Sequence, residues 1–90
     1  MSNNKYKILI VEDEAGIRNF IKTNLETSDY QVICAETYTL GMMMYSSHHP
    51  DLIILDLGLP DRDGLDLIQN VRKSDTIPII VLSARSNEKD

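Results

Sequence analysis

The sequence is poor in the features that mark secreted and membrane proteins. It has a single cysteine, no tryptophan, and no apolar run long enough to cross a bilayer. Cys34 therefore has no partner for a disulfide within the chain, and we expect it to be a buried thiol. The opening residues Met-Ser-Asn-Asn-Lys lack the apolar segment of a signal peptide. We expect a reducing, cytoplasmic location and no membrane association.

Positive charge is also scarce. Nine Lys and Arg residues face 14 Asp and Glu residues, which gives a net charge of -5 with no basic stripe, so direct nucleic-acid binding is not expected. His48 and His49 have no Cys or His at ligand spacing, and a zinc site is not expected either. With 90 residues, 42% of them hydrophobic, the chain is long enough for one small globular domain.

Apolar runs and helical stripes alternate along the whole chain. Strands are predicted at 7–11, 31–35, 52–56 and 77–82, and helices from 15 to about 27, at 38–48, and from 65 to about 73. The apolar positions assigned to the helices are Ile17, Phe20, Ile21 and Leu25 in the first, Leu40, Met43 and Met44 in the second, and Leu65, Ile68 and Val71 in the third. This order predicts an α/β fold with a doubly wound parallel sheet and helices on both faces.

Acidic side chains end two of these strands. Glu12 and Asp13 follow the first strand, Asp56 ends the third, and Ser83 follows the fourth. An acid at one such position is usually a turn residue or a helix cap. In an open parallel sheet, however, ligands bind at the carboxyl edge where the connections change face. If the first and third strands are neighbours, the acids converge there, and together they indicate a site.

The segment after Asp56 reads as a turn into a helix. Gly58 and Pro60 interrupt regular structure, and either Asp61 or Asp63 can cap the helix that follows.

These motifs resemble the receiver domain of bacterial two-component response regulators. The matching features are the strand followed by Glu12-Asp13, the strand Leu-Ile-Ile-Leu-Asp56, Leu59-Pro60 with Gly64 beyond, and Ile-Val-Leu-Ser83-Ala84. The resemblance covers nearly the whole chain and implies a flavodoxin-like, CheY-like sheet of order 2-1-3-4. Within the family, the amino-acid sequences of these stretches are similar to those of the regulators of potassium transport.

The resemblance implies a role for each matching residue. Asp56 is expected to accept a phosphoryl group from a sensor histidine kinase. Glu12 and Asp13 are expected to hold Mg²⁺ or Mn²⁺ together with Asp56 and the backbone carbonyl of Gly58. A hard cation would relieve the repulsion among these carboxylates.

The same resemblance assigns roles at the end of the fourth strand. Ser83 is expected to bind the phosphoryl oxygens, and Ala84 to leave room beside it. The protein is expected to act as a phosphoacceptor and not as an enzyme with turnover.

The chain departs from the family pattern near its end. A complete receiver continues through a fourth helix, a fifth strand with a required lysine, and a fifth helix. We expect residues 1–90 to be an incomplete receiver that lacks these elements and the DNA-binding domain through which a parent protein controls transcription. The strand at 79–82 would then be a sheet edge, and part of the first helix stripe would be uncovered, which predicts a homo-oligomer.

Four other readings remain open. A truncated receiver could serve only as an assembly or docking fragment. A magnesium-dependent phosphohydrolase would share the strand-end Asp, but such enzymes usually have a second Asp where this chain has Gly58. A dinucleotide-binding fold requires a glycine-rich first loop, which is acidic here. The Asp61 to Gly64 segment resembles a calcium loop only superficially, because its Gly is misplaced.

Overall fold

The computed structural model describes residues 5–82. Its elements, in chain order, are β1 (Lys7–Val11), α1 (Ala15–Thr27), β2 (Gln31–Ala35), α2 (Tyr38–His48), β3 (Leu52–Asp56), α3 (Gly64–Arg72) and β4 (Ile79–Leu82). The predicted bounds are confirmed with two exceptions: α3 begins one residue earlier than expected, and the last strand begins two residues later. The amide of Ile77 donates instead to the Asp75 carboxylate at 3.2 Å, in the turn that precedes the strand.

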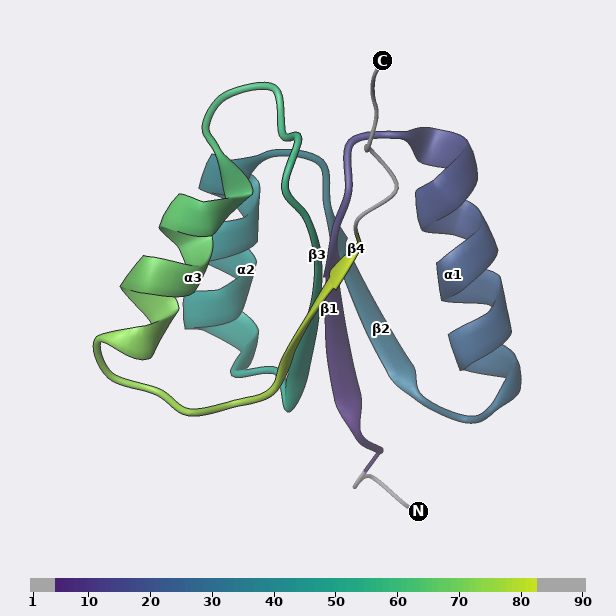
Figure 1. Ribbon diagram of the computed structural model, residues 1–90. Helices are drawn as coiled ribbons and strands as arrows, with labels where there is room; N and C mark the ends of the chain where they lie inside the picture. The colour runs from purple at the N-terminus through teal and green to yellow at the C-terminus, as the bar shows by residue number, and fades with distance from the viewer. Residues whose placement is uncertain (1–4, 83–90) are drawn as a thin grey trace.

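The four strands form one parallel sheet in the order β2-β1-β3-β4, as the sequence predicted. Helices α2 and α3 cover one face of this sheet, and α1 covers the other (Figure 1). The two central strands are β1 and β3. The connection from β1 leads to α1 on one face and the connection from β3 leads to α3 on the other, so the change of face lies between these two strands.

Alternate side chains of the central strands form two unequal cores. On the α2 and α3 face, Leu9, Val11 and Leu55 pack with Leu67 and Val71 of α3, and all five are fully buried. On the α1 face the buried residues are Ile8, Ile10 and Ile54, packed against the half-buried Ile21 and Leu25 of α1. Helix α1 itself has no fully buried residue. The face with two helices therefore contains most of the burial that stabilises the fold.

The buried face of α2 differs from the prediction. Leu40 and Met43 are 37% and 55% exposed, whereas Tyr38 and Gly41 are buried. A Cβ at position 41 would lie 3.1 Å from the methyl groups of Val11. The small residue lets the helix backbone approach the sheet closely at this position, and this approach sets which face turns inward. The apolar residues at 40 and 43 consequently point away from the sheet.

The buried face of α3 is shifted in the same way. Leu65 is 48% exposed, and Leu67, which was not assigned to the core, is fully buried with Val71. Asp63 is the N-cap and accepts a hydrogen bond from the Leu65 amide at 3.0 Å. Gly64, the first helical residue, is buried against the strand end, so the inward face runs through positions 64, 67 and 71.

Some apolar surface remains uncovered among residues 5–82. Strand β4 pairs only with β3 in this part of the chain, and its Ile80 and Val81 are 51% and 39% exposed. On α1, Ile17 and Phe20 are 43% and 70% exposed. Both findings match the expected sheet edge and the expected uncovered stripe. No helix within these residues combines the length and the apolar character needed to cross a bilayer.

Candidate functional site

The strand register brings acidic side chains at the ends of β1 and β3 together. Val11 of β1 is paired with Leu55 of β3, so the next residues lie side by side: Glu12 just beyond β1, and Asp56 as the last residue of β3. Both are buried, with 3% of their surface exposed, whereas Asp13 is exposed. The first two carboxylates are therefore held at the sheet edge, and the third faces the solvent above them.

One oxygen from each of Glu12, Asp13 and Asp56 lies within 4.8 Å of the others. Three carboxylates at this separation repel one another, and a bound cation removes that repulsion. Carboxylate oxygens are the ligands that hard divalent cations prefer. The donor set of this cluster thus fits Mg²⁺ or Mn²⁺, and it does not fit a soft metal that prefers thiolate or imidazole.

The loop that follows β1 is held by Arg18 of α1, whose side chain is half-buried. Arg18 donates to the carbonyl oxygens of Glu12 and Asp13 at 2.9 and 3.4 Å and forms an ion pair with Glu36 at 3.7 Å. The Glu14 amide donates to the Glu12 carboxylate at 2.9 Å. Arg18 was not among the residues singled out from the sequence, yet only 14% of its side chain is exposed. Its contacts depend on the path of the loop, which the periodicity of the helix does not reveal.

The loop that follows β3 is compact. Gly58 forms an isolated antiparallel bridge with Asp63, and the Gly64 amide donates to the Leu57 carbonyl at 2.9 Å. A Cβ at position 64 would lie 2.7 Å from the carbonyl oxygen of Asp56 and the Cα of Leu57. Helix α3 therefore begins in direct contact with the backbone of the strand that ends in Asp56. Ser83 and Ala84, the other predicted site residues, lie outside the described residues.

Comparison with known proteins agrees with this arrangement. The family described as response regulator receiver domain matches residues 8–90. The chain belongs to this family. Membership of this family, together with the observed strand order, excludes the dinucleotide-binding alternative.

A longer transcriptional regulator matches most of this chain. The KDP operon transcriptional regulatory protein KdpE of Escherichia coli K12 is 52% identical over 83 residues, which are 92% of this chain and 37% of that protein. The predicted likeness to regulators of potassium transport is thereby confirmed. The chain spans little more than a third of the length of this curated relative.

Solved structures show the same fold. The non-phosphorylated HemR receiver domain of Leptospira biflexa has a TM-score of 0.82 and 36% identity, covering 93% of this chain and 68% of that one. The MaeR response regulator, in a structure with bound beryllium trifluoride, has a TM-score of 0.81 and 26% identity, covering 90% of this chain and 69% of that one.

Proposed function

We propose that Asp56 accepts a phosphoryl group and that the chain is the phosphoacceptor part of a response regulator. The observation that carries this proposal is the convergence of Glu12, Asp13 and Asp56 within 4.8 Å at the carboxyl edge of a receiver sheet. An Asp56 carboxylate oxygen attacks the phosphorus of a phosphohistidine in a sensor kinase. A P–O bond forms, the P–N bond breaks, and the histidine nitrogen leaves with the electron pair and takes up a proton.

We propose further that Glu12, Asp13 and Asp56 hold Mg²⁺ or Mn²⁺ with the help of the Gly58 carbonyl. When bound, the cation supplies positive charge beside the oxygens of the transferred group. The residues of the chain orient the acceptor. Burial at the end of β3 restricts the Asp56 side chain, and the Arg18 contacts hold the loop that carries Asp13.

The remaining parts of the function belong to a longer parent protein. We infer that residues 1–90 are an incomplete receiver, because the chain covers 68% of the HemR receiver. The missing part would supply the lysine of the fifth strand and, beyond the receiver, a DNA-binding domain. Ser83 is proposed to bind the phosphoryl oxygens, and Ala84 to leave room beside it. The identity to KdpE supports control of potassium-transport genes as the output.

Labelling of the parent protein by a histidine kinase tests the acceptor. Phosphoryl label is expected on Asp56, at one equivalent per chain, and is expected to disappear in Asp56→Asn and on treatment with hydroxylamine, which cleaves acyl phosphates. Ser83→Ala, in which Asp56 is intact, is expected to accept label. Label that resists hydroxylamine would contradict the acceptor assignment, and repeated turnover of a phosphoester would favour the phosphohydrolase alternative.

A second candidate function, assembly or docking without phosphorylation, rests on the uncovered surface of β4. Within the described residues, β4 pairs with β3 along one edge and with no strand along the other, and its Ile80 and Val81 side chains are exposed. We propose that the 90-residue chain associates through this edge or by exchange of an element between copies. Sedimentation at low concentration tests this proposal. A dimer or larger species is expected, and a monomer that unfolds cooperatively would contradict it.

A further inference from the structure

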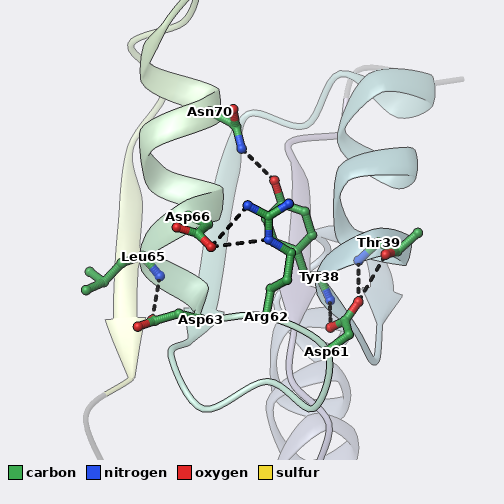
Figure 2. Close-up of polar contacts among 8 residues, drawn as sticks. All are labelled: Tyr38, Thr39, Asp61, Arg62, Asp63, Leu65, Asp66 and Asn70. Carbon is green, nitrogen blue, oxygen red and sulfur yellow. Dashed lines mark hydrogen bonds and ion pairs between the residues drawn. The ribbon is translucent and has the colours of Figure 1, made fainter.

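Asp61 caps α2 and not α3, the helix that follows its own loop. It lies between β3 and α3, yet its carboxylate accepts hydrogen bonds from the Tyr38 and Thr39 amides at 2.8 and 3.0 Å and from the Thr39 hydroxyl at 3.0 Å (Figure 2). These are first-turn groups of α2, whose amides have no partner within the helix. A negative charge at this end of a helix is also favoured by the helix dipole. The Asp61 contacts therefore join the β3–α3 loop to α2.

The cap that α2 needs for its own formation is already present. Thr37 is the N-cap, and its hydroxyl accepts from the Leu40 amide at 3.1 Å. Burial raises the pKa of Asp61, but the hydrogen bonds from Tyr38 and Thr39 outweigh it and bring the pKa below its ordinary value of 3.8. Asp61 is therefore ionised at neutral pH, and the contact with α2 is charge-assisted.

The β3–α3 loop is also restrained by the backbone bridge between Gly58 and Asp63, but it has little apolar packing. Between Asp56 and the start of α3, only Leu57 and Leu59 pack against the core, and the rest of the loop is exposed. Arg62 adds two contacts. Its guanidinium carbon lies 4.5 Å from the centre of the Tyr38 ring, and it forms an ion pair with Asp66 of α3 at 3.2 Å. A segment with so little apolar burial depends on polar contacts to keep one conformation. Loss of the Asp61 contacts is expected to loosen the part of the loop that contains Gly58.

We propose that Asp61 is a positioning residue for the cation and phosphoryl site. By fastening the loop to the N-terminal end of α2, it holds the Gly58 carbonyl and the end of β3 in the arrangement that receives the cation. Asp61 itself contacts neither the cation nor the phosphoryl group. This inference rests on the proposed function. It attributes part of the cation affinity to Asp61, whose hydrogen bonds are to α2.

Mn²⁺ titration of matched variants tests the proposal. Asp61→Ala removes all three contacts, and Asp61→Asn keeps one acceptor oxygen without the charge. Tyr45→Phe is the control, because it removes a single hydrogen bond, from Tyr45 to Asp75 at 2.7 Å, at the other end of the same helix. Asp61→Ala is expected to weaken Mn²⁺ binding about tenfold, the smaller end of the range for residues that orient metal ligands. Asp61→Asn is expected to give an intermediate loss, and Tyr45→Phe none.

Amide hydrogen exchange provides a second readout that does not depend on the metal. In Asp61→Ala the amides between 57 and 63 are expected to exchange faster, while those of Tyr45→Phe in the same segment are unchanged. Unaltered Mn²⁺ affinity in Asp61→Ala, with binding abolished in Asp13→Asn, would overturn the positioning role and leave the proposed function standing. Mn²⁺ affinity that is the same in Asp13→Asn and the parent sequence would instead overturn the proposed function itself.

Discussion

The two ends of the sheet use carboxylates in different ways. At the amino end, Asp51 accepts a hydrogen bond from the Lys7 amide at 2.8 Å, and Asp75 accepts one from the Tyr45 hydroxyl at 2.7 Å. At the carboxyl end, Glu12 and Asp13 lie beside Asp56, with oxygens of all three within 4.8 Å. An acid that accepts from nearby donors stabilises the fold, whereas acids that crowd one another cost stability until a cation binds.

This difference teaches how a small domain separates structure from function. Substitution of Asp51 at the amino end is expected to weaken the protein, and substitution of Asp13, the exposed acid of the cluster, is expected to strengthen it when no metal is bound. Functional sites commonly retain such unfavourable arrangements because their geometry is what the chemistry requires. The following predictions probe that contrast, from the largest expected effect to the smallest.

The largest effect is expected from packing at the carboxyl end. Gly64→Ala places a methyl group 2.7 Å from backbone atoms of Asp56 and Leu57. Backbone atoms cannot move aside as the end of a flexible side chain can. We expect the free energy of unfolding to fall by about 1–3 kcal/mol. Gly16→Ala in α1 is the control, because no atom lies within 4 Å of its added Cβ.

Gly16→Ala is expected to be neutral or stabilising by up to about 1 kcal/mol, since alanine favours a helix over glycine. Urea denaturation measures both variants. Equal stability of Gly64→Ala and the unaltered chain would show that the start of α3 is free to move away from the strand that ends in Asp56.

Replacing an Asp by Ala at the two ends of the sheet is expected to change the free energy of unfolding in opposite directions. Asp51→Ala removes the acceptor for the Lys7 amide and is expected to cost about 1 kcal/mol. Asp13→Ala, measured with a chelator present, is expected to gain up to about 1 kcal/mol, because like charges 4.8 Å apart repel by about that amount in water. Destabilisation by both substitutions would remove the contrast between the two ends.

The smallest effect is a pH dependence of the Tyr45–Asp75 contact. Burial, followed by the hydrogen bond to Asp75, raises the pKa of Tyr45 above its ordinary value of 10.0, and the Tyr45 hydroxyl is the main cause that lowers the pKa of Asp75 below 3.8. An acid whose pKa is lower in the folded state contributes stability at pH values above its pKa in the unfolded chain. That contribution is lost as the pH falls through its pKa in the folded state. A tyrosine whose pKa is higher in the folded state contributes stability at pH values below its pKa in the unfolded chain. That contribution is lost as the pH rises towards its pKa in the folded state.

The stability difference between the unaltered chain and Tyr45→Phe should therefore be constant between about pH 4 and pH 10 and should shrink outside that window. Unfolding in urea across this pH range measures it. A difference that grows as the pH drops below 4 would contradict the assigned direction for Asp75.

Much of the fold was predictable because its signals are local. The uninterrupted apolar runs of β1 and β3 indicate buried parallel strands, and the acids that end them were expected to meet because carboxyl ends of parallel strands share one edge. The faces of α2 and α3 were less predictable. Leu40 and Leu65 are as apolar as true core residues, and their exposure follows from the close approach at Gly41 and the buried start of α3 at Gly64.

The contacts that join separate loops were not predictable. The sequence left open whether Asp61 or Asp63 caps the following helix. Asp63 does so, and Asp61 reaches back to α2, 22 and 23 residues away in the sequence. The contact of Arg18 with Glu36 likewise depends on how α1 lies relative to the end of β2 in space. Composition and periodicity carry information about single elements, and these contacts depend on the assembled sheet.

The most direct test of the central claim is cation-linked stability of the acidic cluster. Unfolding is measured in urea with a chelator and with Mg²⁺ at about 100 times its dissociation constant, where a single site adds about 2.7 kcal/mol to the free energy of unfolding. The unaltered chain is expected to show this gain, and Asp13→Asn and Asp56→Asn are expected to lose most of it at the same Mg²⁺ concentration. An equal gain in all three proteins, or no gain in the unaltered chain, would contradict a cation site formed by Glu12, Asp13 and Asp56.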